Sequence, residues 1–231
     1  DCRIIKHTHE RIDFQLPEGV GYGDRIELNV GEQFAYSEKI KYENPIITSV
    51  LPTNVNTKGN EIITVQGMNF GPSTQRVPPT IHFECDFAID AVTTSCFPKK
   101  QYLNCTVVTY NHGAITCQTV QGDGYDLQTV VTVSNQNNDV SSLLTTSGAS
   151  IWTYEIPSIT KLHPTNGPTE GLDSMIIYGE NFAQTSELSE IEISIGQIVL
   201  PSTKEYILEH NDTSLIVKVP PGVSLVEGHP V

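Results

Sequence analysis

Residues 45–71 read PIITSVLPTNVNTKGNEIITVQGMNFG, and residues 157–183 read PSITKLHPTNGPTEGLDSMIIYGENFA, so one pattern occurs twice without a gap. The shared positions are mostly prolines and glycines, which determine where a backbone turns. They pair as Pro45 and Pro157, Pro52 and Pro164, Asn54 and Asn166, Gly59 and Gly171, Gly67 and Gly179, and Phe70 and Phe182. A pattern that recurs at this period predicts a tandem array of one structural unit.

The start of the chain matches the second half of the same unit. Residues 19–22, GVGY, align with residues 122–125, GDGY. We therefore expect three domains: the C-terminal part of a repeat at 1–44, a complete repeat at 45–156, and a repeat that lacks its last strands at 157–231. On this alignment both ends of the chain fall inside a repeat, which indicates a piece of a longer protein.

Within a repeat, the β-rich runs are short and are bounded by Gly, Pro, Asn and Asp. No segment shows the apolar spacing of an amphipathic helix. About seven strands in about 100 residues is typical of an antiparallel sandwich, so the predicted fold class is all-β, with tandem immunoglobulin-like sandwiches. The runs are residues 62–65, 80–83, 105–109, 115–118, 129–133 and 151–154.

The charge of the chain excludes one class of partner. The 231 residues include 13 Lys and Arg against 27 Asp and Glu, for a net charge of −14, and none of the three predicted segments is basic. Nucleic-acid binding requires clustered Lys and Arg, so we expect no nucleic-acid partner. Apolar runs such as residues 46–51 are too short to cross a bilayer, so any membrane contact would come through segments outside this chain.

The combination of P-T-N, a Gly and a strand that ends in G-x-N-F resembles the IPT/TIG family (immunoglobulin-like, plexin, transcription factor). Residues 52–54, Gly59 and residues 67–70 carry the resemblance, and the second copy repeats it. The resemblance covers essentially the whole chain and implies an E-set immunoglobulin-like sandwich. At Gly67 and Gly179 we expect a positive φ or a tight corner, with the following Phe folded back as a plug of the core.

The family includes intracellular transcription factors as well as extracellular receptors and adhesion proteins, and the cysteines favour the second group. Cys105 and Cys117 lie on predicted neighbouring strands, a common disulfide position in extracellular members. We pair these two and also pair Cys85 with Cys96, although four cysteines allow three connectivities. A zinc site is the alternative, but no C-x-x-C pair is present. We therefore expect disulfide bonds and an extracellular or cell-surface location.

Two further kinds of site follow if the chain is extracellular. Asn104 and Asn211 begin N-x-[ST] sequons and become candidate glycosylation sites, Asn211 in a polar turn and Asn104 beside the expected disulfide. The loop with Phe97, Lys99 and Lys100 is locally basic and partly aromatic in an acidic protein. It is a candidate contact for an acidic partner, and a stapled, solvated loop is the alternative.

No catalytic motif is present, so we expect a non-enzymatic protein with no catalytic residue, cofactor or metal site. The predicted function is cell–cell adhesion or recognition through contacts with another cell-surface or extracellular protein, homophilic or heterophilic. The Asn- and Thr-rich loops and the repeats are similar in style to the tiger family of social amoebae, which acts in adhesion and allorecognition. Alternatives are a repeat of an extracellular fibre or coat, a plexin- or Met-like receptor stalk, and a carbohydrate-binding module. For Trp152 we expect packing against the next repeat.

Overall fold

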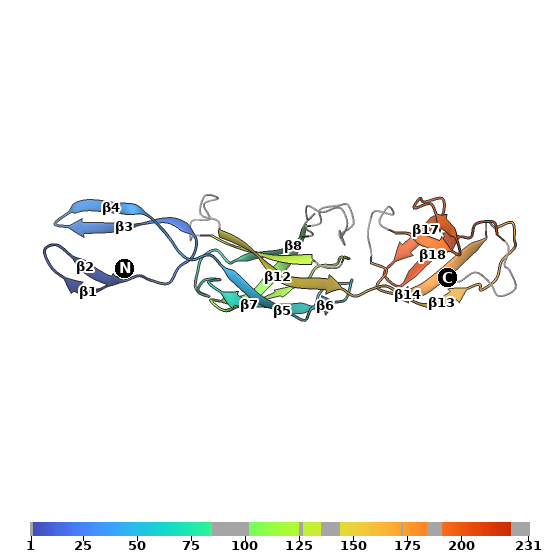
Figure 1. Cartoon of the computed structure of the whole chain (residues 1–231), viewed down its shortest axis with the longest axis horizontal. Coiled ribbons are helices and arrows are strands. Elements are labelled where there is room, and N and C mark those ends of the chain that lie inside the picture. Colours follow the sequence, from blue (N-terminus) through green and yellow to red (C-terminus); the bar gives the residue numbers. More distant parts are fainter. Residues whose placement is uncertain are drawn as a thin grey trace.

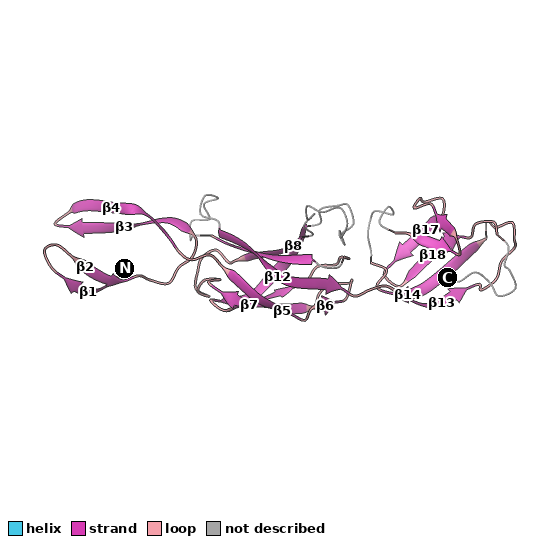
Figure 2. Cartoon of the chain, viewed as in Figure 1, coloured by secondary structure: helices cyan, strands magenta, loops and turns pink. Residues whose placement is uncertain are grey.

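The computed structural model describes residues 2–84, 102–124, 127–134, 144–171, 173–183 and 191–222. This part of the chain contains strands and no helix, which confirms the all-β prediction. The strands form three groups that follow one another along the longest axis of the molecule (Figure 1), and every regular element is a strand (Figure 2). Below, residues 2–44 are the N-terminal segment, residues 45–156 the middle segment and residues 157–222 the third segment.

The N-terminal segment contains two antiparallel hairpins. Strand β1 (Arg3–His7) pairs with β2 (Ile12–Gln15), and β3 (Tyr22–Val30) pairs with β4 (Gln33–Lys41). Gly31 and Glu32 connect β3 to β4, and both have positive φ angles, 58° and 66°. Two positive φ angles in a two-residue loop are those of a type I′ turn, whose twist matches that of the strands.

The described residues of the middle segment form eight strands: β5 (Ile46–Leu51), β6 (Asn54–Val55), β7 (Ile62–Met68), β8 (Thr80–Glu84), β9 (Tyr102–Asn111), β10 (Ala114–Gln118), β11 (Leu127–Val133) and β12 (Leu144–Tyr154). Their hydrogen-bonded order is β5-β7-β10-β9-β8-β11-β12-β6. All strand runs predicted for this segment are present, and several extend further than predicted.

Strand β9 joins the two sheets of this sandwich. Its first part pairs with β8, where Cys105 lies opposite Ile81, and its second part pairs with β10, where Thr109 lies opposite Thr116. The change of partner falls between Cys105 and Thr106, and an irregularity near Val108 then interrupts the pairing with β10; such bulges bend a strand. The sheets enclose one core, to which both contribute alternate side chains, among them Val50, Ile63, Val65, Ile81, Phe83, Ile115, Val131 and Trp152.

The third segment repeats the first part of this architecture. A four-stranded sheet has the order β13 (Ser158–His163), β14 (Ser174–Glu180), β18 (Ser214–Lys218) and β17 (Ile207–Asn211). A separate pair is formed by β15 (Ile193–Ile195) and β16 (Ile198–Leu200). Its own core consists of buried apolar side chains, namely Ile177, Leu200, Ile207, Leu215 and Val217.

The repeated G-x-N-F corner differs from the prediction in one respect. The positive φ lies at the Asn of the motif, 64° at Asn69 and 60° at Asn181, and not at Gly67 or Gly179. The glycine serves close approach instead, because a Cβ at Gly67 would overlap the Ile46 carbonyl oxygen and the Phe70 ring. Phe70 is fully buried in the middle core, as the predicted plug.

Candidate functional site

The contacts that join successive segments form the best-defined polar site in the described structure. At the first junction, the side-chain amide of Asn69 donates to the carbonyl oxygen of Asn44 at 3.0 Å and to a Glu43 carboxylate oxygen at 3.4 Å. Asn44 is the last residue before Pro45, where the middle segment begins. Asn69, whose backbone has the left-handed conformation, therefore binds the linker just before the middle segment begins.

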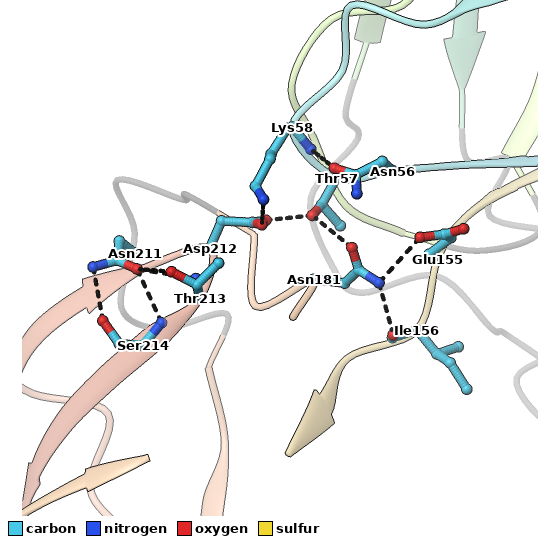
Figure 3. Close-up of polar contacts among 10 residues, drawn as sticks. All are labelled: Asn56, Thr57, Lys58, Glu155, Ile156, Asn181, Asn211, Asp212, Thr213 and Ser214. Carbon is cyan, nitrogen blue, oxygen red and sulfur yellow. Dashed lines mark hydrogen bonds and ion pairs between the residues drawn. The ribbon is translucent and has the colours of Figure 1, made fainter. Parts of the chain in front are cut away.

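The second junction repeats this arrangement with the aligned residues. The Asn181 amide donates to the Ile156 carbonyl oxygen at 3.3 Å and to a Glu155 carboxylate oxygen at 3.2 Å (Figure 3). Asn tolerates the left-handed conformation better than most residues, and its short side chain can reach a nearby backbone. The same pair of hydrogen bonds, from the Asn amide to a backbone carbonyl and to a Glu carboxylate, therefore holds the linker at both junctions.

The second junction has an additional network that connects the two segments directly. Asp212, in the turn between β17 and β18, is buried and accepts a short hydrogen bond from the Thr57 hydroxyl of the middle segment. Its other carboxylate oxygen lies 3.4 Å from the Lys58 ammonium, and the Thr57 hydroxyl also lies 3.4 Å from the Asn181 side-chain oxygen (Figure 3). A buried carboxylate requires such partners, so the network favours one arrangement of the two segments.

Thr57 and Lys58 are positioned by the turn that follows β6. The Asn56 side-chain oxygen accepts a hydrogen bond from the Lys58 backbone N–H at 2.8 Å, an Asx turn that presents both residues to the third segment. Asp212 is positioned in the same way, because the Asn211 side-chain oxygen accepts from the N–H groups of Thr213 and Ser214. Two Asx turns thus face each other across the junction (Figure 3).

The first junction is joined by apolar contact more than by charge. Val20 of the N-terminal segment is buried within the core of the middle segment. Gly71 has a φ of 99°, and a Cβ there would overlap the Gln75 side-chain oxygen and lie 2.6 Å from a Val20 methyl carbon, so glycine is needed where the two segments meet. The His112 and Glu18 side chains lie 3.7 Å apart, but both are largely exposed and contribute little.

A tyrosine closes each of the two repeated units. The Tyr154 hydroxyl donates to the Val120 carbonyl oxygen at 2.8 Å, and the Tyr42 hydroxyl donates to the Pro17 carbonyl oxygen at 3.0 Å. Burial, and secondarily the charge of Asp123, raises the pKa of Tyr154 above its ordinary value of 10.0. The phenol is therefore held in its neutral, hydrogen-bond-donating form.

The predicted disulfide residues are only partly described. Cys105 and Cys117 form a disulfide between β9 and β10, with their Cα atoms 5.7 Å apart, and both are buried in the middle core. Cys2, aligned with Cys105 in the sequence, is an exposed free thiol. Cys85 and Cys96 lie outside the described residues, as do Phe97, Lys99 and Lys100 of the predicted partner-binding loop.

Both sequon asparagines are exposed in the structure. Asn104 lies on β9, directly before the bridged Cys105, and Asn211 ends β17 at the second junction. The Asn211 side-chain nitrogen donates to the Ser214 hydroxyl at 2.8 Å. A glycan on Asn211 would therefore project from the hairpin that also carries Asp212.

Trp152 differs from its prediction. Its ring is fully buried inside the middle segment, stacked on Phe83 at a centroid distance of 4.4 Å and in edge contact with Tyr154 at 4.6 Å. It does not pack against the next repeat. A residue in this position is unavailable to stack on a sugar ring.

The described residues include no group of three or more His, Cys, Asp or Glu side chains arranged to hold a metal ion. No helix in the described part of the chain has the length and apolar character needed to cross a membrane. Sequence reasoning did not identify Thr57, Asp212 or Asn181 as junction residues. The signal that could have found Asn181 is its recurrence with Asn69 in G-x-N-F.

Comparison with known proteins finds a model of the IPT/TIG domain family that matches residues 45–147 and 157–231. No curated protein matches the chain. Among solved structures, the chain is similar to two of the plexin A4 full extracellular region, containing domains 1 to 8 and domains 1 to 10. In each case the identity is 14%, the TM-score is 0.30 and 77% of this chain is covered. The chain spans 15% and 13% of the lengths of those two plexin chains.

Proposed function

Because the chain belongs to the IPT/TIG family, whose domains have a non-enzymatic immunoglobulin-like fold, we propose that it is an extracellular repeat segment of a cell-surface protein. In this role it mediates cell–cell adhesion or recognition through protein contacts. Loops and sheet faces on a rigid sandwich scaffold are suited to such contacts. The similarity in style to the tiger family supports the adhesion and self-recognition form of the proposal.

The observation that carries the extracellular placement is the disulfide between Cys105 and Cys117, buried in the middle core. Structural disulfides form and persist in oxidising compartments and are rare in the cytosol. Cys85 with Cys96 is the second bridge in the proposal. The repeat boundaries proposed are 1–44, 45–156 and 157–231, and the two separate apolar cores of the middle and third segments support the division at 156/157.

The test is intact-mass measurement of the chain secreted from eukaryotic cells, alkylated with and without prior reduction. We expect no alkylation of Cys105 or Cys117 before reduction, and a peptide map that joins them. The same sample, treated with an enzyme that removes N-glycans, shows whether Asn211 and Asn104 carry glycans; we expect Asn211 to be occupied. Free thiols at Cys105 and Cys117 in freshly secreted protein contradict the extracellular placement.

A receptor stalk, or a repeat of a fibre or coat, is the second candidate, and the second junction favours it. The buried Asp212 with Thr57 and Lys58 fixes neighbouring segments relative to one another, as a spacer requires. The sequence that follows this chain in the full protein distinguishes a receptor stalk from a fibre or coat. A membrane span there indicates a receptor, and continued repeats indicate a fibre. A carbohydrate-binding module has less support, since Trp152 is buried.

A further inference from the structure

One four-stranded sheet of the middle segment carries no charge at all. Strands β5, β7, β10 and β9 read IITSVL, IITVQGM, AITCQ and YLNCTVVTYN, without a single Asp, Glu, Lys, Arg or His. This composition is unexpected in a chain in which 17% of residues are charged and the net charge is −14. The inward side chains of these strands form the apolar core. Folding therefore explains the absence of charge on the inward side but not on the outward side.

The outward face combines hydroxyls with exposed apolar side chains. The strand register places Leu51 opposite Thr64, Thr64 opposite Thr116, and Thr116 opposite Thr109. Around this row lie apolar side chains that are each about half exposed, namely Ile46, Leu51, Ile62, Met68 and Val108. We call this the neutral face, defined by the outward residues of β5, β7, β10 and β9.

Two pairs of polar side chains on the neutral face are already hydrogen-bonded to each other. The hydroxyls of Thr109 and Thr116 lie 2.6 Å apart, and the Ser49 hydroxyl donates to the Gln66 side-chain oxygen at 3.1 Å. Groups that are paired within the face lose little when water is removed from above them. The face can therefore be covered at a low desolvation cost.

The fold itself does not require a neutral face. The corresponding sheet of the third segment carries Lys161 on β13, Glu180 on β14, Glu209 on β17 and Lys218 on β18. In the gapless alignment, Ser49 corresponds to Lys161 and Met68 corresponds to Glu180. Charged residues are thus compatible with these positions of the fold, although β5, β7, β10 and β9 of the middle segment have none.

We propose that the neutral face binds the neutral face of a second copy of this chain. A partner of opposite charge would be attracted by the acidic surfaces, whereas a second copy with the same net charge of −14 is repelled by them. Like-charged copies can form a close contact only where no unpaired charge is buried, and this face meets that condition. A self-complementary contact of this kind has twofold symmetry.

The size of the face sets the expected strength. Four strands about 4.8 Å apart and about six residues long cover roughly 20 by 20 Å. That is smaller than the ~800 Å² which each partner of a standard interface contributes. We therefore expect weak association, with a Kd in the micromolar range or above, as suits a contact repeated many times between surfaces.

Salt concentration distinguishes this contact from the one predicted for Lys99 and Lys100. Salt screens the repulsion between two acidic chains, so pairing through the neutral face strengthens as salt rises. A contact between that basic loop and an acidic segment of another molecule weakens instead. Whether self-association strengthens or weakens as salt rises therefore shows which of the two contacts forms.

The experiment is sedimentation equilibrium of the purified secreted chain at low and high salt, with three variants. Met68→Glu and Ser49→Lys each place on the neutral face the type of residue that the third segment carries there, and they change the net charge in opposite directions. Ser174→Glu is the control, since it adds the same charge as Met68→Glu at an exposed position of β14. The fluorescence of Trp152 verifies that each variant is folded.

We expect the wild-type chain and Ser174→Glu to self-associate more strongly at high salt, and both neutral-face variants to raise the Kd at least about tenfold. A wild-type chain that stays monomeric at millimolar concentration overturns the inference. So does equal weakening by Ser174→Glu and Met68→Glu, or association that weakens with salt. This inference rests on the proposed function in protein contacts and identifies a second copy of the chain as the partner. The thiol and glycan measurements test the extracellular location separately, so the two proposals can fail independently.

Discussion

Asn69 and Asn181 have the same left-handed backbone conformation, with φ angles of 64° and 60°, and each donates its side-chain amide to the carbonyl of the residue just before its own segment. The acceptors are Asn44 and Ile156. The motif that shapes each sandwich therefore also fixes how the preceding linker enters it. Orientation between repeats is in this way encoded within one repeat and does not need a separate linker sequence.

Replacing Asp212 by Asn should loosen the second junction. The change removes the ion pair with Lys58 and weakens the short hydrogen bond from Thr57. Since Lys58 is more than half exposed, we expect a loss of only about 1 kcal/mol in stability but a wider range of orientations between the middle and third segments. Small-angle scattering measures this as a broader distance distribution. Asp173→Asn, which removes an exposed charge from the same segment, should leave the distribution unchanged.

Gly67→Ala should destabilise the middle segment. The added methyl would overlap the Ile46 carbonyl oxygen and the Phe70 ring, which can yield only if β5 moves away from β7. We expect a loss of about 1–3 kcal/mol, as for other overpacked sites. Gly113→Ala is the matched control, because its nearest atom, the Gly67 carbonyl oxygen, would be 3.7 Å away. Denaturation followed by Trp152 fluorescence gives both values, and equal losses would contradict the close-approach explanation.

Tyr154→Phe should change both the stability and its dependence on pH. At neutral pH the variant loses the hydrogen bond to Val120, worth about 1 kcal/mol. In the folded protein the pKa of Tyr154 is raised above 10.0, so its contribution is fully present below pH 10 and is lost as the pH rises further.

The difference in unfolding free energy between the wild type and Tyr154→Phe should therefore shrink above pH 10. Urea titrations at a series of alkaline pH values measure it. Tyr178→Phe, at an exposed phenol in the third segment, serves as the control and should track the wild type throughout. A difference that stays constant from pH 8 to pH 11 would count against the buried, neutral phenol.

Replacing both Cys105 and Cys117 by Ala should cost about 3 kcal/mol, the loop-closure entropy expected for a bridge spanning about a dozen residues. Both side chains are buried, so the loss should appear in the unfolding of the middle segment. Calorimetry resolves it as a lower transition temperature for that segment. An unchanged transition would mean that the bridge does not constrain the unfolded chain.

The periodic features of the fold were predictable from the sequence, and the contacts between segments were not. Alternation along Ile62–Met68 and the recurrence of Pro, Gly and Phe identify strands and corners because each depends on local geometry. The pairing of Thr57 with Asp212 joins residues 155 positions apart and appears in only one of the two junctions, so no repeat pattern reports it.

One alternative that the sequence left open and one wrong prediction have the same physical origin. The sequence showed that Gly67 is required but not which neighbour requires it, and a carbonyl on the adjacent strand is visible only once the register is known. Trp152 was expected near the next repeat because it is close to the linker in sequence. Strand alternation instead directs its ring inward onto Phe83.

The parallel pairing of β6 with β12 has a mechanical consequence. Strand β6 lies near the start of the middle segment and β12 at its end, and they are joined by hydrogen bonds from the Thr153 N–H to Thr53 and from the Glu155 N–H to Val55. Tension applied through the neighbouring segments pulls these two strands in opposite directions along their length. The bonds between them are then loaded together and not one after another, so a pulled chain should extend at its junctions before this sandwich ruptures.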